Sequence, residues 1–61
     1  MADTLAGRLI ATRQARGFSL AELGRRAGVQ ASTVQRIELE QHEPSLKVLR
    51  NLARALEVDV A

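Results

Sequence analysis

The stretch AELGRRAGVQASTVQRIE, Ala21–Glu38, contains two short helical patterns separated by a single glycine, Gly28. The segment SLAE, which begins at Ser19, is a capping box, in which the serine and glutamate side chains satisfy each other's backbone N–H groups. A glycine after the last apolar residue ends a helix. Two short helices joined this tightly predict a helix-turn-helix over about residues 19–39.

The second of these helices, from about Ala31 to Leu39, has two unlike sides. Val34 and Ile37 lie about one turn apart and are expected to face the core. Its other positions carry alanine, serine, threonine, glutamine and arginine. Gln30 stands at the cap position, where glutamine is a weak cap. The small, polar outer face has no role in packing a core.

Helical patterns also flank this stretch. One covers about residues 4–16, with Asp3 or Thr4 as its cap and Gly17 after its end, and the other is capped by Ser45. The sequence therefore predicts an all-α fold, a compact bundle of four to five short helices in a single domain over residues 1–61. The apolar stripes are Leu5, Ala6, Leu9 and Ile10 in the first helix and Leu46, Leu49, Leu52, Ala53 and Leu56 in the last, followed by Val58 and Val60.

Composition limits the chemistry that is open to the chain. Its 61 residues are 46% hydrophobic with one aromatic, Phe18, which is placed to pack on Leu23 as a hydrophobic staple. There is no cysteine and one histidine, His42, so we expect no enzyme, no metal site and no cofactor. No apolar run approaches a membrane span and there is no signal segment, which predicts a cytoplasmic protein.

The net charge of +2 comes from nine basic and seven acidic residues, and every basic residue except Lys47 is arginine. The arginine fork suits phosphates and guanine edges. A skewed codon supply explains the same composition equally well, so the charge alone does not identify a nucleic-acid partner.

Two segments, LIATRQARGFSLAELGRRAGVQASTVQRIE and EPSLKVLRNLARALEVDV, together resemble the Cro/C1-type (XRE) helix-turn-helix family of phage and bacterial DNA-binding proteins. The resemblance covers about Leu5 to Val60. It implies a lambda-repressor-like fold of five helices whose recognition helix, Ala31–Ile37, enters the major groove of double-stranded DNA. It also implies a transcriptional regulator, most simply a repressor, associated with the nucleoid.

The resemblance assigns roles to individual residues. Arg36 can form a forked pair with guanine, and hydroxyl and methyl groups on the same helix can contact other base edges. An ion pair between Arg13 and Glu38 would tie the first helix to the recognition helix. The implied base-reading residues are Ala31, Ser32, Thr33 and Arg36, and the implied contacts to the DNA backbone come from Ser19, Leu20, Gln30, Gln35 and His42.

This chain also departs from the family pattern. Family members usually have glycine where this chain has Glu40, which predicts a different turn after the third helix. The following loop is acidic, with Glu40 and Glu43, and carboxylates near DNA repel phosphate. His42 compensates only when it is protonated.

Two functions remain open. The first is sequence-specific DNA binding by a homodimer to an inverted-repeat operator, for which the tail ALEVDVA offers a dimer surface unless it packs on its own core. The second is a helix-turn-helix whose outer face binds a protein. The acidic loop and Leu20 favour the protein partner, whereas Arg25, Arg26 and Arg36 favour DNA, which we consider the better supported. The chain is compatible with being a fragment of a longer regulator.

Overall fold

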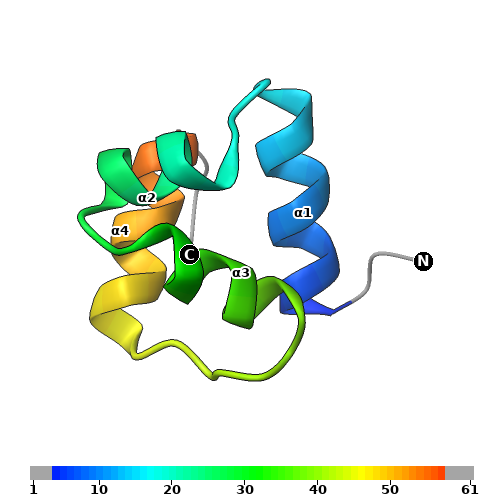
Figure 1. Ribbon diagram of the computed structural model, residues 1–61, viewed down its shortest axis with the longest axis vertical. Helices are drawn as coiled ribbons and strands as arrows, with labels where there is room; N and C mark the ends of the chain where they lie inside the picture. Colours follow the sequence, from blue (N-terminus) through cyan, green and yellow to red (C-terminus); the bar gives the residue numbers. More distant parts are fainter. Residues whose placement is uncertain (1–3, 58–61) are drawn as a thin grey trace.

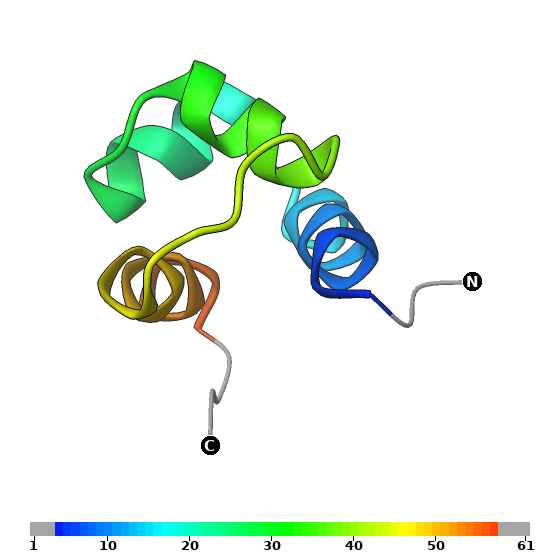
Figure 2. The ribbon, with the colours of Figure 1, turned by 90° about the horizontal axis from the view of Figure 1, so that it is seen from below.

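The computed structural model describes residues 4–57 of the chain. In that range the chain forms four helices and no strand, so the predicted all-α fold is confirmed. Val58 and Val60, and with them any fifth helix, lie outside the described residues. Figure 2 shows α1 and α4 end-on, with α3 lying across one side of the molecule. The helices are α1 (Leu5–Ala15), α2 (Leu20–Ala27), α3 (Ala31–Glu38) and α4 (Leu46–Leu56) (Figure 1).

Three of the helices begin at a hydroxyl cap. The side-chain oxygens of Thr4, Ser19 and Ser45 each accept a hydrogen bond from the backbone N–H three residues later, at 3.0, 3.0 and 3.2 Å. At the fourth start, the side chain of Gln30 makes no capping bond. Among the described residues the predicted capping box is only half formed, because the Glu22 carboxylate binds two arginines of the next turn.

The core is aliphatic and draws on all four helices. Leu23 and Val34 are completely buried, and Phe18 packs against the same cluster from the start of α2. The expectation that Leu5 and Leu46 belong to the core is wrong, since they are 44% and 58% exposed. Each is the first residue of its helix, and burial begins further along. The buried hydrophobic residues are Ala6, Leu9, Leu23, Ala27, Val34, Ile37, Leu52, Ala53 and Leu56.

The turn between α2 and α3 depends on two glycines. Gly28 ends α2 in the left-handed conformation, with φ 75°, and the Val29 N–H bonds back to the Gly24 carbonyl at 2.9 Å. A Cβ on Gly24 would lie 2.6 Å from the Val29 carbonyl oxygen and 3.2 Å from the Ala31 nitrogen. The start of α3 therefore approaches α2 more closely than any side chain at Gly24 allows. The only sequence signal for this is a glycine inside a helical pattern.

The turn after α3 uses a left-handed residue that is not glycine. Glu40 has φ 60°, its N–H bonds to the Ile37 carbonyl at 3.1 Å, and the next N–H bonds to the Arg36 carbonyl at 2.8 Å. This pair of bonds is the Schellman motif, which favours glycine at the left-handed position. The prediction of a different turn is therefore wrong. The backbone adopts the turn that glycine usually makes, and Glu40 is strained because it has a side chain at a positive φ.

Candidate nucleic-acid interface

α3 has a buried side and an exposed side. Val34 and Ile37 are 0% and 3% exposed and anchor the helix in the core. Ser32 and Arg36 are both exposed and lie four residues apart, so they share the side of α3 that faces away from the core. The outer side is therefore free to meet another molecule. Of the other candidate residues on this helix, Gln35 is exposed, and Ala31 and Thr33 are half-buried at its flanks.

The first turn of α3 is held by the backbone of Gln30. Its carbonyl accepts hydrogen bonds from the N–H groups of Thr33 and Val34, at 3.0 and 3.2 Å. Its exposed side chain turns toward the outer face, where Oε1 accepts a hydrogen bond from the Ser32 hydroxyl at 3.4 Å. The Gln30 and Ser32 side chains therefore lie together at the N-terminal end of α3.

The start of α2 presents backbone rather than side-chain groups. The Ser19 hydroxyl oxygen accepts from the Glu22 N–H at 3.0 Å, so one of its lone pairs is already engaged. The Leu20 side chain is half-buried against the core. Of these two residues, only the exposed hydroxyl of Ser19 and the N–H groups at the helix start are suited to an anion.

Arg13 and Glu38 are brought together across the molecule. Arg13 Nε lies 2.6 Å from Glu38 Oε2, and a second guanidinium nitrogen lies 3.1 Å from Oε1. The third nitrogen donates to the Phe18 carbonyl at 2.8 Å. The pair is largely shielded from water, with the two side chains 14% and 9% exposed. One guanidinium therefore connects α1, the start of α2 and the end of α3.

Arg25 and Arg26 are partly neutralised by the same carboxylate. Both guanidinium groups form ion pairs with Glu22, and the Arg26 pair has a length of 2.6 Å. Arg26 also lies over the Phe18 ring, 4.6 Å from its centroid. These pairs follow the three- and four-residue spacings that favour contacts along a helix. Arg25 and Arg26 therefore add less positive charge to the surface of α2 than the sequence alone implies.

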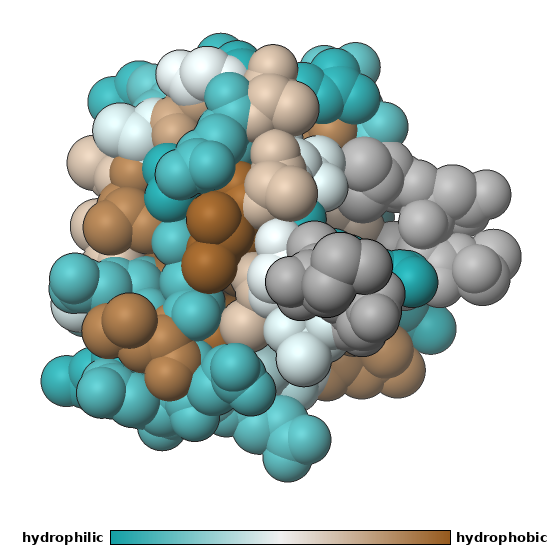
Figure 3. Space-filling model, turned by 90° about the vertical axis from the view of Figure 1, so that its right-hand side faces the viewer, coloured by the Kyte–Doolittle hydropathy of each residue, from teal (hydrophilic) through white to brown (hydrophobic). Residues whose placement is uncertain are grey.

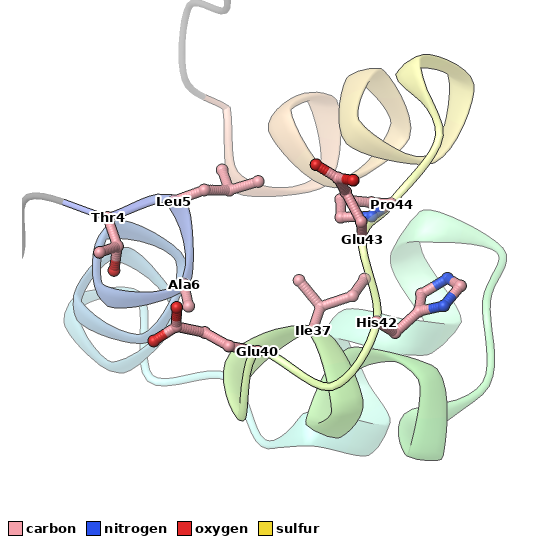
Figure 4. Close-up of a pocket in the computed structure, with 8 residues that line it drawn as sticks. All are labelled: Thr4, Leu5, Ala6, Ile37, Glu40, His42, Glu43 and Pro44. Atoms are coloured by element: carbon pink, nitrogen blue, oxygen red, sulfur yellow. The ribbon is translucent and has the colours of Figure 1, made fainter.

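The loop after α3 is acidic and exposed, with Glu40, His42 and Glu43 all open to solvent. It closes one side of an open pocket of about 350 Å³, into which Ile37 points, whereas the His42 ring is directed away from it (Figure 4). The remaining lining residues are Thr4, Leu5, Ala6 and Pro44. His42 is therefore placed to meet a molecule outside the loop.

The tail considered as a dimer surface is only partly described. Leu56 is 3% exposed and belongs to the core, and Ala55 packs against it. Leu56 is therefore not free for a partner, and residues 58–61 lie outside the described range. From the α1 side, apolar surface occurs in patches between hydrophilic residues (Figure 3).

A helix-turn-helix family model matches residues 9–61. The chain therefore belongs to the Cro/C1-type (XRE) helix-turn-helix family, whose members are DNA-binding regulators. No curated protein matches the chain.

None of the helices in residues 4–57 is long and apolar enough to cross a membrane. The same residues contain no group of three or more histidine, cysteine or acidic side chains that could hold a metal ion.

Proposed function

We propose that the protein is a sequence-specific regulator of transcription that reads the major groove with α3. The observation that carries the proposal is the shared exposure of Ser32 and Arg36 on the side of α3 opposite Val34 and Ile37. An α-helix fits the major groove, and short polar side chains with one arginine match its donor and acceptor pattern. Membership of a family of DNA-binding regulators supports the same conclusion.

Each candidate residue has a role in this proposal. Arg36 pairs with guanine, while Ser32, Thr33 and Ala31 contact neighbouring base edges through hydroxyl and methyl groups. Arg13 and Glu38 hold α3 in position and do not contact bases. Contacts to the DNA backbone come from the Ser19 hydroxyl, the N–H of Leu20, Gln30, Gln35 and His42.

The proposed target is an inverted-repeat operator bound by a homodimer. A single module of this size contacts too few base pairs for high specificity, and two-fold symmetry doubles the site. Occupation of the operator would most simply repress transcription in the cytoplasm, at the nucleoid.

The experiment that tests the proposal is selection of bound duplexes from a random pool at two salt concentrations. Enrichment of an inverted repeat, retained at the higher salt, is the expected result, because base contacts survive the screening that weakens phosphate contacts. Failure to enrich any motif at low salt would contradict DNA recognition.

A second function, binding of a protein partner through the outer face of α3, is favoured by two observations. Glu40 and Glu43 are exposed beside the recognition helix, and the Leu20 side chain is turned into the molecule. The two carboxylates repel phosphate, and the Leu20 side chain offers phosphate no polar contact. An absence of duplex enrichment, combined with a folded protein, would favour this alternative.

A further inference from the structure

We propose that the pocket between the start of α1 and the loop after α3 binds a peptide segment of another protein, one with an arginine beside an aliphatic residue. The pocket has a volume of about 350 Å³, which is near the lower limit of typical ligand sites. It therefore accommodates one or two side chains but not a folded element. The proposal does not rest on DNA binding by α3, because it concerns another part of the surface.

The floor of the pocket is apolar. Leu5, Ala6, Ile37 and Pro44 contribute to its lining, and Ile37 points into it from the end of α3 (Figure 4). Ile37 is 3% exposed because it also packs in the core, whereas Leu5, which the core leaves uncovered, is 44% exposed. The aliphatic stem of a long side chain would remove this surface from water.

The edge of the pocket is acidic. Glu40 and Glu43 line it, both are exposed, and within residues 4–57 neither carboxylate forms an ion pair. The His42 ring is directed away from the pocket (Figure 4). No arginine or lysine of the described part of the chain belongs to the lining. A cation on the ligand would therefore meet two carboxylates that no described residue neutralises.

The backbone that carries these carboxylates is constrained. The Glu40 N–H bonds to the Ile37 carbonyl at 3.1 Å, and the next N–H bonds to the Arg36 carbonyl at 2.8 Å. Pro44 restricts the backbone of Glu43, the residue that it follows. Little backbone freedom remains to be lost at these positions when a ligand binds, which lowers the cost of binding.

Arginine suits this arrangement better than other ligand groups. Its stem packs on apolar surface, and its planar fork donates to a carboxylate through two N–H groups. An aliphatic neighbour on the same peptide would cover Leu5. DNA phosphates are repelled by Glu40 and Glu43. Two copies of the chain that met at this face around a two-fold axis would bring the same carboxylates together, so the charge also disfavours a second copy.

NMR titration of the intact, isotope-labelled chain without DNA tests the proposal. The probe is the peptide Ala-Leu-Arg-Leu-Ala, acetylated and amidated so that its ends carry no charge. The matched control peptides replace the arginine by glutamine or both leucines by serine. The arginine peptide should shift the amide signals of Leu5, Ile37, Glu40 and Glu43 in a saturable way. Each control peptide should bind at least about 2-fold more weakly.

Variants of the chain locate the contact. Glu40→Gln and Glu43→Gln should each weaken binding of the arginine peptide by about 2- to 5-fold, because each removes one carboxylate and keeps the size of the side chain. Glu57→Gln is the matched control and should leave the affinity unchanged. Glu57 is also an exposed glutamate with a positive φ, but it is not part of the pocket lining. A thermal melt of each variant checks that it is folded.

A lack of saturable shifts at the pocket residues would overturn the proposal. Equal affinity for the arginine and glutamine peptides, or equal losses for Glu57→Gln and Glu40→Gln, would overturn it too, since the pocket carboxylates would then have no specific role. Shifts at the same residues on raising the protein concentration without peptide would assign the pocket to a second copy, and this result also contradicts the proposal. None of these outcomes bears on duplex selection, so the failure of this proposal is distinguishable from the failure of the proposed function.

Discussion

The Arg13 guanidinium and the Glu38 carboxylate meet in a two-point ion pair, with Nε and Oε2 2.6 Å apart. The same guanidinium donates to the Phe18 carbonyl, at the point where the chain enters α2. A planar fork can hold both partners at fixed angles, which an ammonium group cannot. The pair therefore fixes the end of α3 relative to α1, and with it the direction of the outer face.

Replacing Arg13 by alanine should lower the free energy of unfolding by about 2–4 kcal/mol, because it leaves the Glu38 carboxylate shielded from water without its partner. Arg13→Lys should lose less, since it keeps the charge but not the fork. Arg8→Ala, an exposed arginine on the same helix, is the matched control and should change stability by less than about 0.5 kcal/mol. Urea unfolding of the three variants is the measurement. Equal midpoints for Arg13→Ala and Arg8→Ala would contradict the role of the pair.

Most of the fold follows from local sequence signals. Ser19 and Ser45 are capping residues in the expected places, Gly17 and Gly28 are left-handed, and the inward pair of α3 is buried. These features depend on neighbouring residues, so the sequence pattern is sufficient to predict them.

Other features depend on contacts that local sequence does not specify. The space available at Gly24 depends on how closely the start of α3 packs against α2. The exposure of Leu5 is set by the limits of the neighbouring elements, because periodicity predicts a side of the helix but not how far the core extends along it. The engagement of Arg25 and Arg26 by Glu22 is a competition between partners that spacing alone does not decide.

The close approach at Gly24 predicts a reversal of the usual glycine rule. In an unobstructed helix, glycine to alanine stabilises by about 0.5–1 kcal/mol. Gly24→Ala should instead destabilise by about 1–3 kcal/mol, because its Cβ would overlap the Val29 carbonyl 2.6 Å away.

Gly17→Ala is the control for Gly24→Ala, since Gly17 is left-handed but has no heavy atom within 4 Å of the added Cβ. It should cost about 1–2 kcal/mol from backbone strain alone. Thermal unfolding with circular dichroism detection compares the two. A stabilised Gly24→Ala variant would mean that α2 and α3 are further apart than described.

Glu40→Gly should raise the free energy of unfolding by about 1 kcal/mol. The residue has φ 60°, where a side chain is strained and glycine is not. Glu40→Ala removes the same charge but keeps a Cβ, so the difference between the two variants isolates the backbone effect. Chemical denaturation in moderate salt provides the comparison. If alanine stabilised as much as glycine, charge rather than conformation would be responsible.

Arg36→Ala should weaken binding to the selected operator by about 1–3 kcal/mol and relax the preference at one base position. Loss of a forked contact to guanine affects one base pair, whereas loss of a phosphate contact affects all duplexes alike. Arg50→Ala, at an exposed arginine on α4, removes the same charge from a different helix. Fluorescence anisotropy with operator and random duplexes measures the affinity of the Arg36→Ala and Arg50→Ala variants. Equal losses on the two duplexes would show that Arg36 contacts the backbone.

Glu43→Lys should tighten binding to every duplex and steepen its dependence on salt. The exposed loop follows α3. Under the proposed function, a carboxylate there opposes phosphate and an ammonium group there attracts it. One new phosphate contact adds about 0.9 to the slope of log affinity against log salt. Glu57→Lys makes the same change of charge at the opposite end of α4 and should leave the slope nearly unaltered. Titrations at four salt concentrations give the slopes, and identical slopes for the two variants would place the acidic loop clear of the DNA.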